Sequence, residues 1–189
     1  MDKKILEAFE KSNALQTGHF VLTSGRHSDK YMQCAQVFQY PKYSNLLSEA
    51  LVDKIKHLEI DVVVGPAMGG LIFGFNVAQK LGVKSIFAER VEKKMTFKRG
   101  FTINPGEKVL IVEDVITTGG SVKEVMEVVE GLGGEVVAVG CAVDRTAGKD
   151  VGYEFYSLYE MDIKSYEPHN CPMCKEKMPT TKPGSTGKK

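Results

Sequence analysis

Residues 109–121 read VLIVEDVITTGGS, and this stretch decides the fold. The apolar run at 109–112 is typical of a buried strand, and the segment from Ser121 to Leu132 is typical of a helix. Two acids and a turn rich in threonine and glycine lie between them. In open α/β sheets, ligands bind beyond the carboxyl ends of the strands. The stretch therefore predicts an α/β fold with a ligand site at residues 113–121.

The alternation of strand and helix extends through the rest of the chain. Strands are predicted at 61–64, 84–88, 108–112, 135–143 and 153–158, and helices at 3–12, 41–58, 71–81 and 121–132. Near-continuous apolar strands between helices are typical of a parallel sheet that helices cover on both faces. We therefore expect an α/β fold with a parallel sheet flanked by helices.

The pattern before residue 41 differs from the pattern after it. Two extended runs, 18–23 and 30–37, are joined by a turn at 24–26 and predict a small hairpin-like lobe, which we call the hood (about 15–40). The core of a single domain, 1–174, is then expected at about 41–165. The remaining residues, 175–189, are rich in Lys, Pro, Thr and Gly and predict a flexible tail.

Composition excludes several classes of protein. The chain has 189 residues, 42% hydrophobic and 26% charged, which is typical of a globular domain. Its formal net charge of +1 provides no global field for nucleic acid, so an anion site must be local. No window approaches the roughly 20 apolar residues of a membrane span, and the first residues lack an apolar signal core. We expect a cytoplasmic protein that binds neither nucleic acid nor membrane.

The turn after the acids has the chemistry of a phosphate site. Its hydroxyl donors and glycines are Thr117, Thr118, Gly119, Gly120 and Ser121. Glycines let the backbone turn its N–H groups inward, and the helix that follows adds about half a positive charge at its N-terminus. Neither the P-loop motif nor the dinucleotide motif G-x-G-x-x-G occurs after a strand. The pattern favours a monophosphate over a nucleoside triphosphate.

The two acids before this turn, Glu113 and Asp114, suggest a sugar next to the phosphate. Carboxylates accept hydrogen bonds from paired sugar hydroxyls, and such charged hydrogen bonds are worth about 1.5–3 kcal/mol each. Two carboxylates followed by a phosphate cradle fit a ribose 5-phosphate. The alternative is an ordinary strand-to-helix loop in which Asp114 and Ser121 only cap the helix.

This string resembles the signature of type I phosphoribosyltransferases, which bind phosphoribosyl pyrophosphate (PRPP). The resemblance implies that Glu113 and Asp114 hold the ribose hydroxyls and that Asp114 and Lys94 are catalytic. It also implies that Mg²⁺ is held mainly through PRPP and that no side chain of the protein is assigned as a metal ligand. The residues implied to bind PRPP are Arg90, Lys94, Glu113, Asp114, Val115, Ile116, Thr117, Thr118, Gly119, Gly120 and Ser121.

Two further features indicate which base would receive the ribose 5-phosphate. Residues 18–31, GHFVLTSGRHSDKY, are similar to the segment that covers the base in orotate phosphoribosyltransferases. Arg145 ends a predicted strand, where a guanidinium could grip a carboxylate with two hydrogen bonds, and orotate carries a carboxylate. The resemblance implies that Arg145 and Thr117 bind orotate. It implies transfer of ribose 5-phosphate to orotate in de novo pyrimidine (UMP) biosynthesis, giving orotidine 5′-phosphate and pyrophosphate. The alternatives are transfer to another base, or a PRPP-binding regulator that acts on nucleic acid.

The charged segment 90–104 predicts a flexible loop that leads into a small hairpin, suited to an active-site lid. In the family this loop reaches the neighbouring subunit, so the resemblance implies a homodimer with shared active sites. Many bacterial members have lysine where this chain has Gly69 and Thr23. Their mobile loop also carries an extra lysine and a histidine, and the aligned positions in this chain are Val91 and Thr96. Which cations hold the pyrophosphate is therefore open, with Lys93, Lys98 and Arg99 as candidates.

A second glycine-rich turn, residues 65–70, reads GPAMGG. It suits close approach of an anion to the backbone, and in the family the matching turn lies beside the pyrophosphate. A tight strand-to-helix turn without ligand explains the same residues equally well.

The cysteines and histidines have no assigned role in this site. Cys34 and Cys141 are expected in the core as reduced thiols. Residues 171–174, CPMC, form a C-x-x-C for which a simple turn is favoured over a local disulfide or a structural zinc site, because no second C-x-x-C supplies two further ligands. The histidines expected at the surface or in turns are His19, His27 and His57.

Overall fold

A six-stranded sheet forms the body of the protein in a computed structural model that describes residues 3–183. Its order is β5-β4-β3-β6-β7-β8, and every neighbouring pair is parallel except β4 and β5. The strands are β3 (Val62–Pro66), β4 (Lys84–Val91), β5 (Lys94–Thr96), β6 (Lys108–Ile116), β7 (Glu135–Asp144) and β8 (Phe155–Glu160). The predicted parallel sheet is confirmed.

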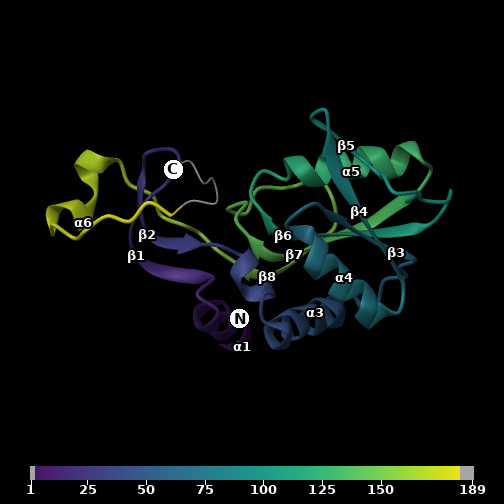
Figure 1. The fold of residues 1–189 in the computed structure, drawn as a ribbon, viewed down its shortest axis with the longest axis horizontal. Coiled ribbons are helices and arrows are strands. Elements are labelled where there is room, and N and C mark those ends of the chain that lie inside the picture. Colours follow the sequence, from purple (N-terminus) through teal and green to yellow (C-terminus); the bar gives the residue numbers. More distant parts are fainter. Residues whose placement is uncertain (1–2, 184–189) are drawn as a thin grey trace.

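Helices cover both faces of this sheet (Figure 1). They are α1 (Lys3–Lys11), α2 (Ala35–Phe38), α3 (Pro41–Ile55), α4 (Gly70–Leu81) and α5 (Gly120–Gly131). Alternate residues of β6 enter two separate cores: Leu110 packs with α1, α3 and α4, whereas Ile111 packs with α5. Successive residues of a strand point to opposite faces of the sheet, so one apolar run contributes to both cores. β6 is therefore buried on both faces, and its end is a rigid base for a site.

β6 is longer than its apolar run. The strand was expected to end at Val112, but its ladder with β7 continues through Glu113 opposite Cys141 to Ile116 opposite Asp144. Backbone pairing does not depend on apolar side chains, so hydropathy underestimates the length of the strand. As a result, both acids lie within the strand.

The hood is a hairpin of β1 (Leu15–Val21) and β2 (His27–Met32), paired antiparallel. The expected extended run to residue 37 was wrong beyond Met32, because the chain forms the short helix α2 there. Val37 and Phe38 are buried in the core from this helix. A helical turn allows both side chains to reach the same core.

The C-terminal segment returns to the hood. It contains a 3₁₀ helix, η1 (Pro168–Asn170), and helix α6 (Pro172–Lys175). Beyond them, Thr181 donates its N–H to the carbonyl of His19 and accepts from the N–H of Val21. The flexible tail expected from Lys175 is thus hydrogen-bonded to the hood as far as Thr181, and its last six residues, 184–189, lie outside the described residues. Figure 1 shows hood and C-terminal segment together as a lobe beside the sheet.

The charged segment after β4 begins as a hairpin. Glu92 and Lys93 have positive φ angles of 50° and 68°, as a tight two-residue turn requires, and β5 follows directly. The expected order, flexible loop first and hairpin second, was wrong. Met95 of β5 is buried in the core beside α5, so the base of the hairpin is anchored while its tip projects into solvent (Figure 1).

Across residues 3–183, none of the helices has both the length and the apolar character needed to cross a membrane.

Candidate functional site

The turn from Thr117 to Ser121 forms a polar hollow of about 80 Å³ at the end of β6. Gly119 lies at the N-cap of α5 with a left-handed φ of 73°. No side chain of the described residues caps the helix there, so the first N–H groups of α5 are left for another acceptor. An anion at this position would receive those N–H groups and the positive end of the helix dipole. This geometry suits an anion, and the binding of a phosphate in this hollow stays a prediction.

The carboxyl groups of Glu113 and Asp114 are packed together directly before this hollow. Glu113 is only 9% exposed, and its Oε1 accepts the N–H of Asp114 at 3.1 Å. Burial raises the pKa of Glu113 to about 8, and the charge of Asp114 adds to the shift. Burial also raises the pKa of Asp114, although the N–H of Val115 at 2.7 Å favours its ionised form. The pair therefore carries less than two full charges at neutral pH.

The turn from Gly65 to Gly70 packs against the same acids. A Cβ atom at Gly69 would lie 2.4 Å from Asp114 Oδ1 and 2.9 Å from Glu113 Oε1. A Cβ at Gly70 would lie 2.4 Å from the carbonyl oxygen of Val112. Both glycines are thus required by packing at this edge of the sheet. The tight-turn interpretation therefore holds for this segment, and its proximity to a bound pyrophosphate stays a prediction.

Arg145 follows β7 on the same edge, where its backbone N–H donates to the carbonyl of Ile116 at 2.8 Å. Its side chain is half-buried, and burial lowers the pKa of the guanidinium, an effect that the nearby Tyr31 of the hood partly offsets. Among residues 3–183, no carboxylate lies within ion-pair distance of it. A half-buried cation with no counter-charge is suited to receive an anionic ligand.

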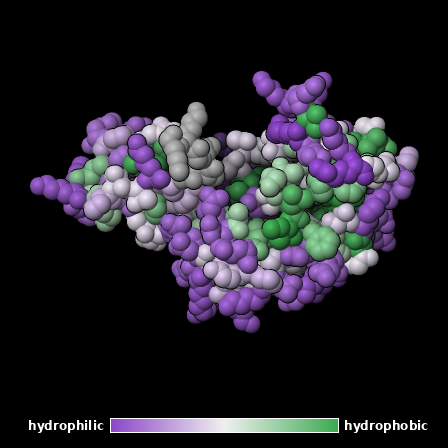
Figure 2. Space-filling model, viewed as in Figure 1, coloured by the Kyte–Doolittle hydropathy of each residue, from purple (hydrophilic) through white to green (hydrophobic). Residues whose placement is uncertain are grey.

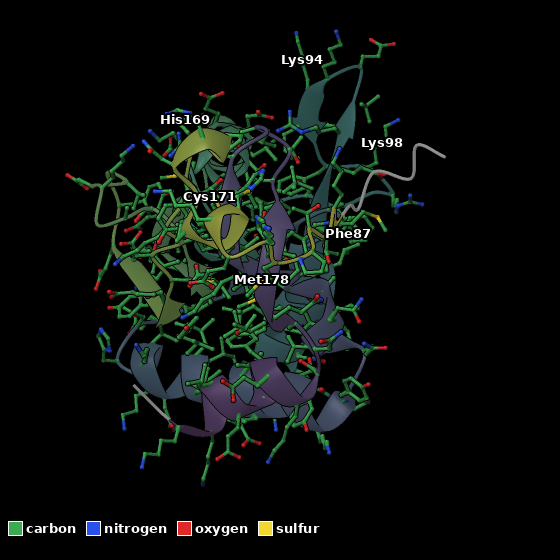
Figure 3. The ribbon with its side chains drawn as sticks, turned by 90° about the vertical axis from the view of Figure 1, so that its left-hand side faces the viewer. Phe87, Lys94, Lys98, His169, Cys171 and Met178 are labelled. Carbon is green, nitrogen blue, oxygen red and sulfur yellow. The ribbon has the colours of Figure 1, made fainter. Side chains whose placement is uncertain are left out.

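The two cations expected from the hairpin do not meet the acids. Arg90 pairs with Glu124 of α5, with one N–O distance of 2.7 Å. Lys94 is exposed on the projecting hairpin (Figure 3), and no ion pair within residues 3–183 joins it to Asp114. The catalytic pair implied by the resemblance is therefore not assembled within this single chain.

Tyr153 is a neighbour of the cradle that the sequence pattern did not indicate. Its hydroxyl is buried without a hydrogen-bond partner among the described residues, and a Cβ at Gly119 would lie 2.9 Å from it. Burial raises the pKa of this hydroxyl. Tyr153 precedes β8, and only the fold brings it beside Gly119.

The predicted location of two histidines was wrong. His19 and His27 were expected at the surface or in turns, but they are only 3% and 8% exposed. They face each other within the hood and lie against Cys171 and Cys174. His57 is exposed, as expected, and Cys34 and Cys141 are buried core thiols.

The packing of Gly69 predicts a cost for any side chain at this position. Gly69→Ala should lower the free energy of unfolding by about 1–3 kcal/mol, because the methyl group must displace the carboxyl pair. Urea unfolding measures the change. Gly131→Ala is the control, since a Cβ there meets nothing within 4 Å. Equal stability of both variants would show that the turn does not press on the acids.

The raised pKa of Glu113 predicts a stability that falls with pH. Between about pH 4.5 and 8 the unfolded chain releases this proton first, so the contribution of the neutral carboxyl is lost as pH rises. Glu113→Gln should therefore exceed the parent in unfolding free energy by at least about 1 kcal/mol at pH 8, and by much less at pH 4.5. Glu127→Gln, at an exposed position of α5, is the control. A gain independent of pH would contradict the assignment.

Comparison with known proteins gives one consistent result. The model of the phosphoribosyl transferase domain matches residues 34–166. An orotate phosphoribosyltransferase of Caldanaerobacter subterraneus is 55% identical over 184 residues, 97% of each chain. One of Thermotoga maritima is 50% identical over 186 residues, 98% of this chain and all of that relative.

Solved structures share the fold at lower identity. A crystal structure of orotate phosphoribosyltransferase from Aeropyrum pernix has a TM-score of 0.69 at 24% identity, covering 83% of this chain and 93% of that chain. An adenine phosphoribosyltransferase from Thermoanaerobacter pseudethanolicus has a TM-score of 0.63 at 23% identity, covering 70% and 88%. The fold is thus common to enzymes for different bases, and the close relatives decide between them. The chain belongs to the phosphoribosyl transferase family and, within it, to the orotate phosphoribosyltransferases.

Proposed function

We propose that this site binds PRPP and transfers its ribose 5-phosphate to orotate, giving orotidine 5′-phosphate and pyrophosphate in pyrimidine biosynthesis. The observation that carries the proposal is the buried acid pair that directly precedes an uncapped helix N-terminus at the end of β6. Relatives of this activity match nearly the whole chain at 48–55% identity. Transfer to another base and a purely regulatory role are correspondingly disfavoured.

Each part of PRPP has a matching part of the site. The 5-phosphate accepts hydrogen bonds from the turn at 117–121 and the N-terminus of α5. The ribose hydroxyls donate to Glu113 and Asp114, which gives these buried acids a hydrogen-bonding role. The two parts are adjacent in the chain because β6 leads directly into the turn. A short continuous segment of the chain therefore sets the distance between the sugar site and the phosphate site.

Orotate binds through its carboxylate to Arg145. The guanidinium can make two parallel hydrogen bonds to a carboxylate, and it has no carboxylate partner of its own within residues 3–183. Tyr31 of the hood lies near the guanidinium of Arg145. A purine base carries no carboxylate and would leave the cation half-buried and unpaired. This contrast gives the site its preference for orotate.

The reaction needs no nucleophile from the protein. A nitrogen of orotate forms the new bond to C1 of the ribose while the bond from C1 to the pyrophosphate oxygen breaks, through an oxocarbenium-like state. The residues contribute by positioning: the turn holds the phosphate, the acids hold the sugar, and Arg145 holds the base. A negatively charged acid pair near the ribose also stabilises positive charge that develops on it.

Mg²⁺ fits the donor chemistry of this site. Proteins commonly bind it through one or two carboxylates together with substrate phosphates, and Glu113 and Asp114 are carboxylates of that kind. The one group of three or more potential metal-ligating side chains in residues 3–183 lies elsewhere, in the hood. We therefore propose that PRPP carries the ion. It would neutralise charge on the departing pyrophosphate.

We further propose a homodimer in which the hairpin serves the partner's site. Met68, Ile72 and Phe75 are 82%, 53% and 59% exposed. Ile72 and Phe75 share one face of α4 because they are three residues apart. Figure 2 shows hydrophobic residues gathered on this side of the sheet. Such a patch suits a subunit interface, and Lys94, remote from the acids of its own chain, suits a role in the partner's site. A cytoplasmic location and the absence of nucleic-acid binding stay predictions.

The proposed reaction is tested by following orotate absorbance with PRPP and Mg²⁺. The wild-type protein should consume orotate and leave purine bases unchanged. Arg145→Ala should raise the KM for orotate at least about tenfold, since loss of the paired hydrogen bonds costs at least about 1.4 kcal/mol, while the KM for PRPP changes little. Lys149→Ala, an exposed cation in the same loop, is the control. An unchanged orotate KM would remove Arg145 from the base site.

Shared active sites are tested by mixing two inactive variants, Lys94→Ala and Asp114→Asn. If the hairpin acts in the partner's site, mixed dimers contain one intact site, and reassociation should restore about a quarter of the wild-type activity. The control mixes Asp114→Asn with Arg145→Ala. Both changes affect the same chain's half of the site, so this mixture should show no activity beyond the sum of its two components. No recovery in the first mixture, with subunit exchange verified, would contradict the shared site.

A further inference from the structure

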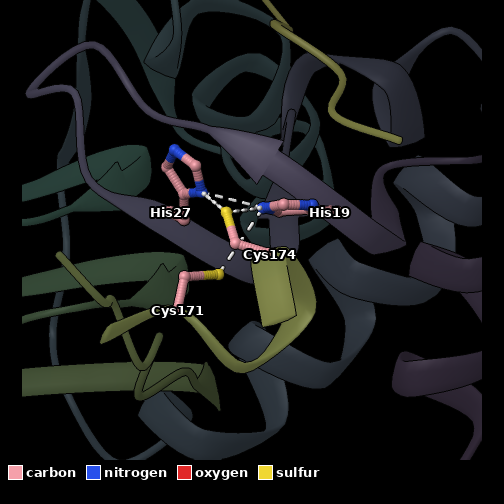
Figure 4. Close-up of side chains that lie close together, drawn as sticks. All are labelled: His19, His27, Cys171 and Cys174. Carbon is pink, nitrogen blue, oxygen red and sulfur yellow. Dashed lines mark hydrogen bonds between the residues drawn. The ribbon is translucent and has the colours of Figure 1, made fainter. Parts of the chain in front are cut away.

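Four side chains that are far apart in the sequence converge at one point in the lobe formed by the hood and the C-terminal segment. His19 of β1 and His27 of β2 face Cys171 and Cys174 at the start of α6 (Figure 4). Their potential ligand atoms all lie within 4.8 Å of one another. His19, His27 and Cys171 are buried, and Cys174 closes the group on the solvent side. The group belongs to neither the phosphate turn nor the base site.

The distances within this group approach the edges of a metal-centred tetrahedron. His19 Nε2 lies 3.5 Å from Cys171 Sγ and 3.7 Å from Cys174 Sγ, and His27 Nδ1 lies 3.3 Å from Cys174 Sγ. A tetrahedron with metal–nitrogen distances of about 2.0 Å and metal–sulfur distances of about 2.3 Å has edges of about 3.3–3.8 Å. The two ring nitrogens are closer, at 2.8 Å. Two nitrogens at this distance need a proton or a cation between them.

A second contact orients the first histidine. His19 Nδ1 lies 2.8 Å from the carbonyl oxygen of Met178. A carbonyl only accepts, so Nδ1 carries the proton and Nε2 directs a lone pair into the group. Ligating histidines in metal sites commonly make this kind of outer hydrogen bond. Figure 3 shows Met178 and Cys171 in the same lobe.

We propose that His19, His27, Cys171 and Cys174 bind one structural Zn²⁺ ion. Two imidazole nitrogens and two cysteine sulfurs are a ligand set that zinc prefers, and the C-x-x-C spacing is typical of such sites. All four positions are filled by the protein, which leaves no open position for a substrate. The role is therefore structural.

Few buried apolar residues stabilise the lobe, so a bound ion would add stability that its packing does not provide. Its buried apolar residues Phe20, Cys171 and Met173 belong to neither core of the described sheet. The two chain segments are otherwise joined by polar contacts, such as the mutual backbone hydrogen bonds of His27 and Tyr166 and the pair of Arg26 with Glu167. Small lobes without a sufficient core are commonly stabilised by a metal. One ion would fix both hood strands to the C-terminal segment.

The test uses untagged, full-length protein purified without added metal. Elemental analysis should find about one zinc per chain. Removal of the metal with a chelator should lower the melting temperature of the protein, and added Zn²⁺ should restore it. The double variant Cys171→Ser/Cys174→Ser should lose the zinc. The controls are His169→Ala, an exposed histidine two residues before Cys171, and Cys141→Ala, a cysteine of the core; both should keep the metal.

A second measurement covers the case in which the double variant fails to fold. Metal-free wild-type protein given Co²⁺ should show the visible absorption of a tetrahedral ion together with thiolate-to-metal charge transfer. Wild-type protein that neither contains zinc nor binds Co²⁺ in this form would overturn the proposal. A disulfide between Cys171 and Cys174, found by thiol counting in the native protein, or iron in place of zinc, would overturn it as well. Orotate turnover is measured separately, so failure here leaves the proposed reaction untouched.

Discussion

The desolvation of two adjacent carboxyl groups at the end of β6 constrains everything around them. Glu113 and Asp114 lie within a strand that is buried on both faces, and burial raises the pKa of each. Such a pair persists only when its oxygens accept hydrogen bonds, here partly from the N–H groups of Asp114 and Val115. Gly69 must lack a side chain because the turn that covers the acids leaves no room for one. The ribose hydroxyls of the proposed ligand would donate further hydrogen bonds to these carboxyl oxygens.

The same packing bears on position 69, where the family resemblance led us to expect a lysine. A lysine at the position of Gly69 would meet the acids at its first side-chain carbon, so the cation has to come from elsewhere in this chain. Arg90, which the family resemblance implies as one source, is paired with Glu124, and the two side chains of that pair are 45% and 36% exposed. Exposed ion pairs contribute little, at about 0–1 kcal/mol. If Arg90 binds the pyrophosphate as proposed, the exchange of Glu124 for that ligand would cost little free energy.

The proposed site combines residues held by the rigid sheet with residues of the separate hood. The turn at 117–121 and the acids are held by the sheet, whereas the hood approaches the proposed base site through Tyr31 near Arg145. The position of the hood depends on its contacts with the C-terminal segment, where the histidine and cysteine group lies. That group and the base site are thus connected through the two strands of one hairpin. Stabilising the far end of the hairpin would limit the motion of the end that carries Tyr31.

The sequence by itself determined the alternation of the main strands and helices after residue 41, the parallel sheet and the turn at 117–121, because apolar periodicity and glycine-rich turns are local properties. It did not determine that β6 continues through its acids, since backbone pairing with β7 is not visible in hydropathy. It also missed the burial of His19 and His27, which depends on a segment about 150 residues away in the chain. Only the tertiary structure could bring those histidines to the C-x-x-C, because ligands of one site converge by folding and share no local pattern.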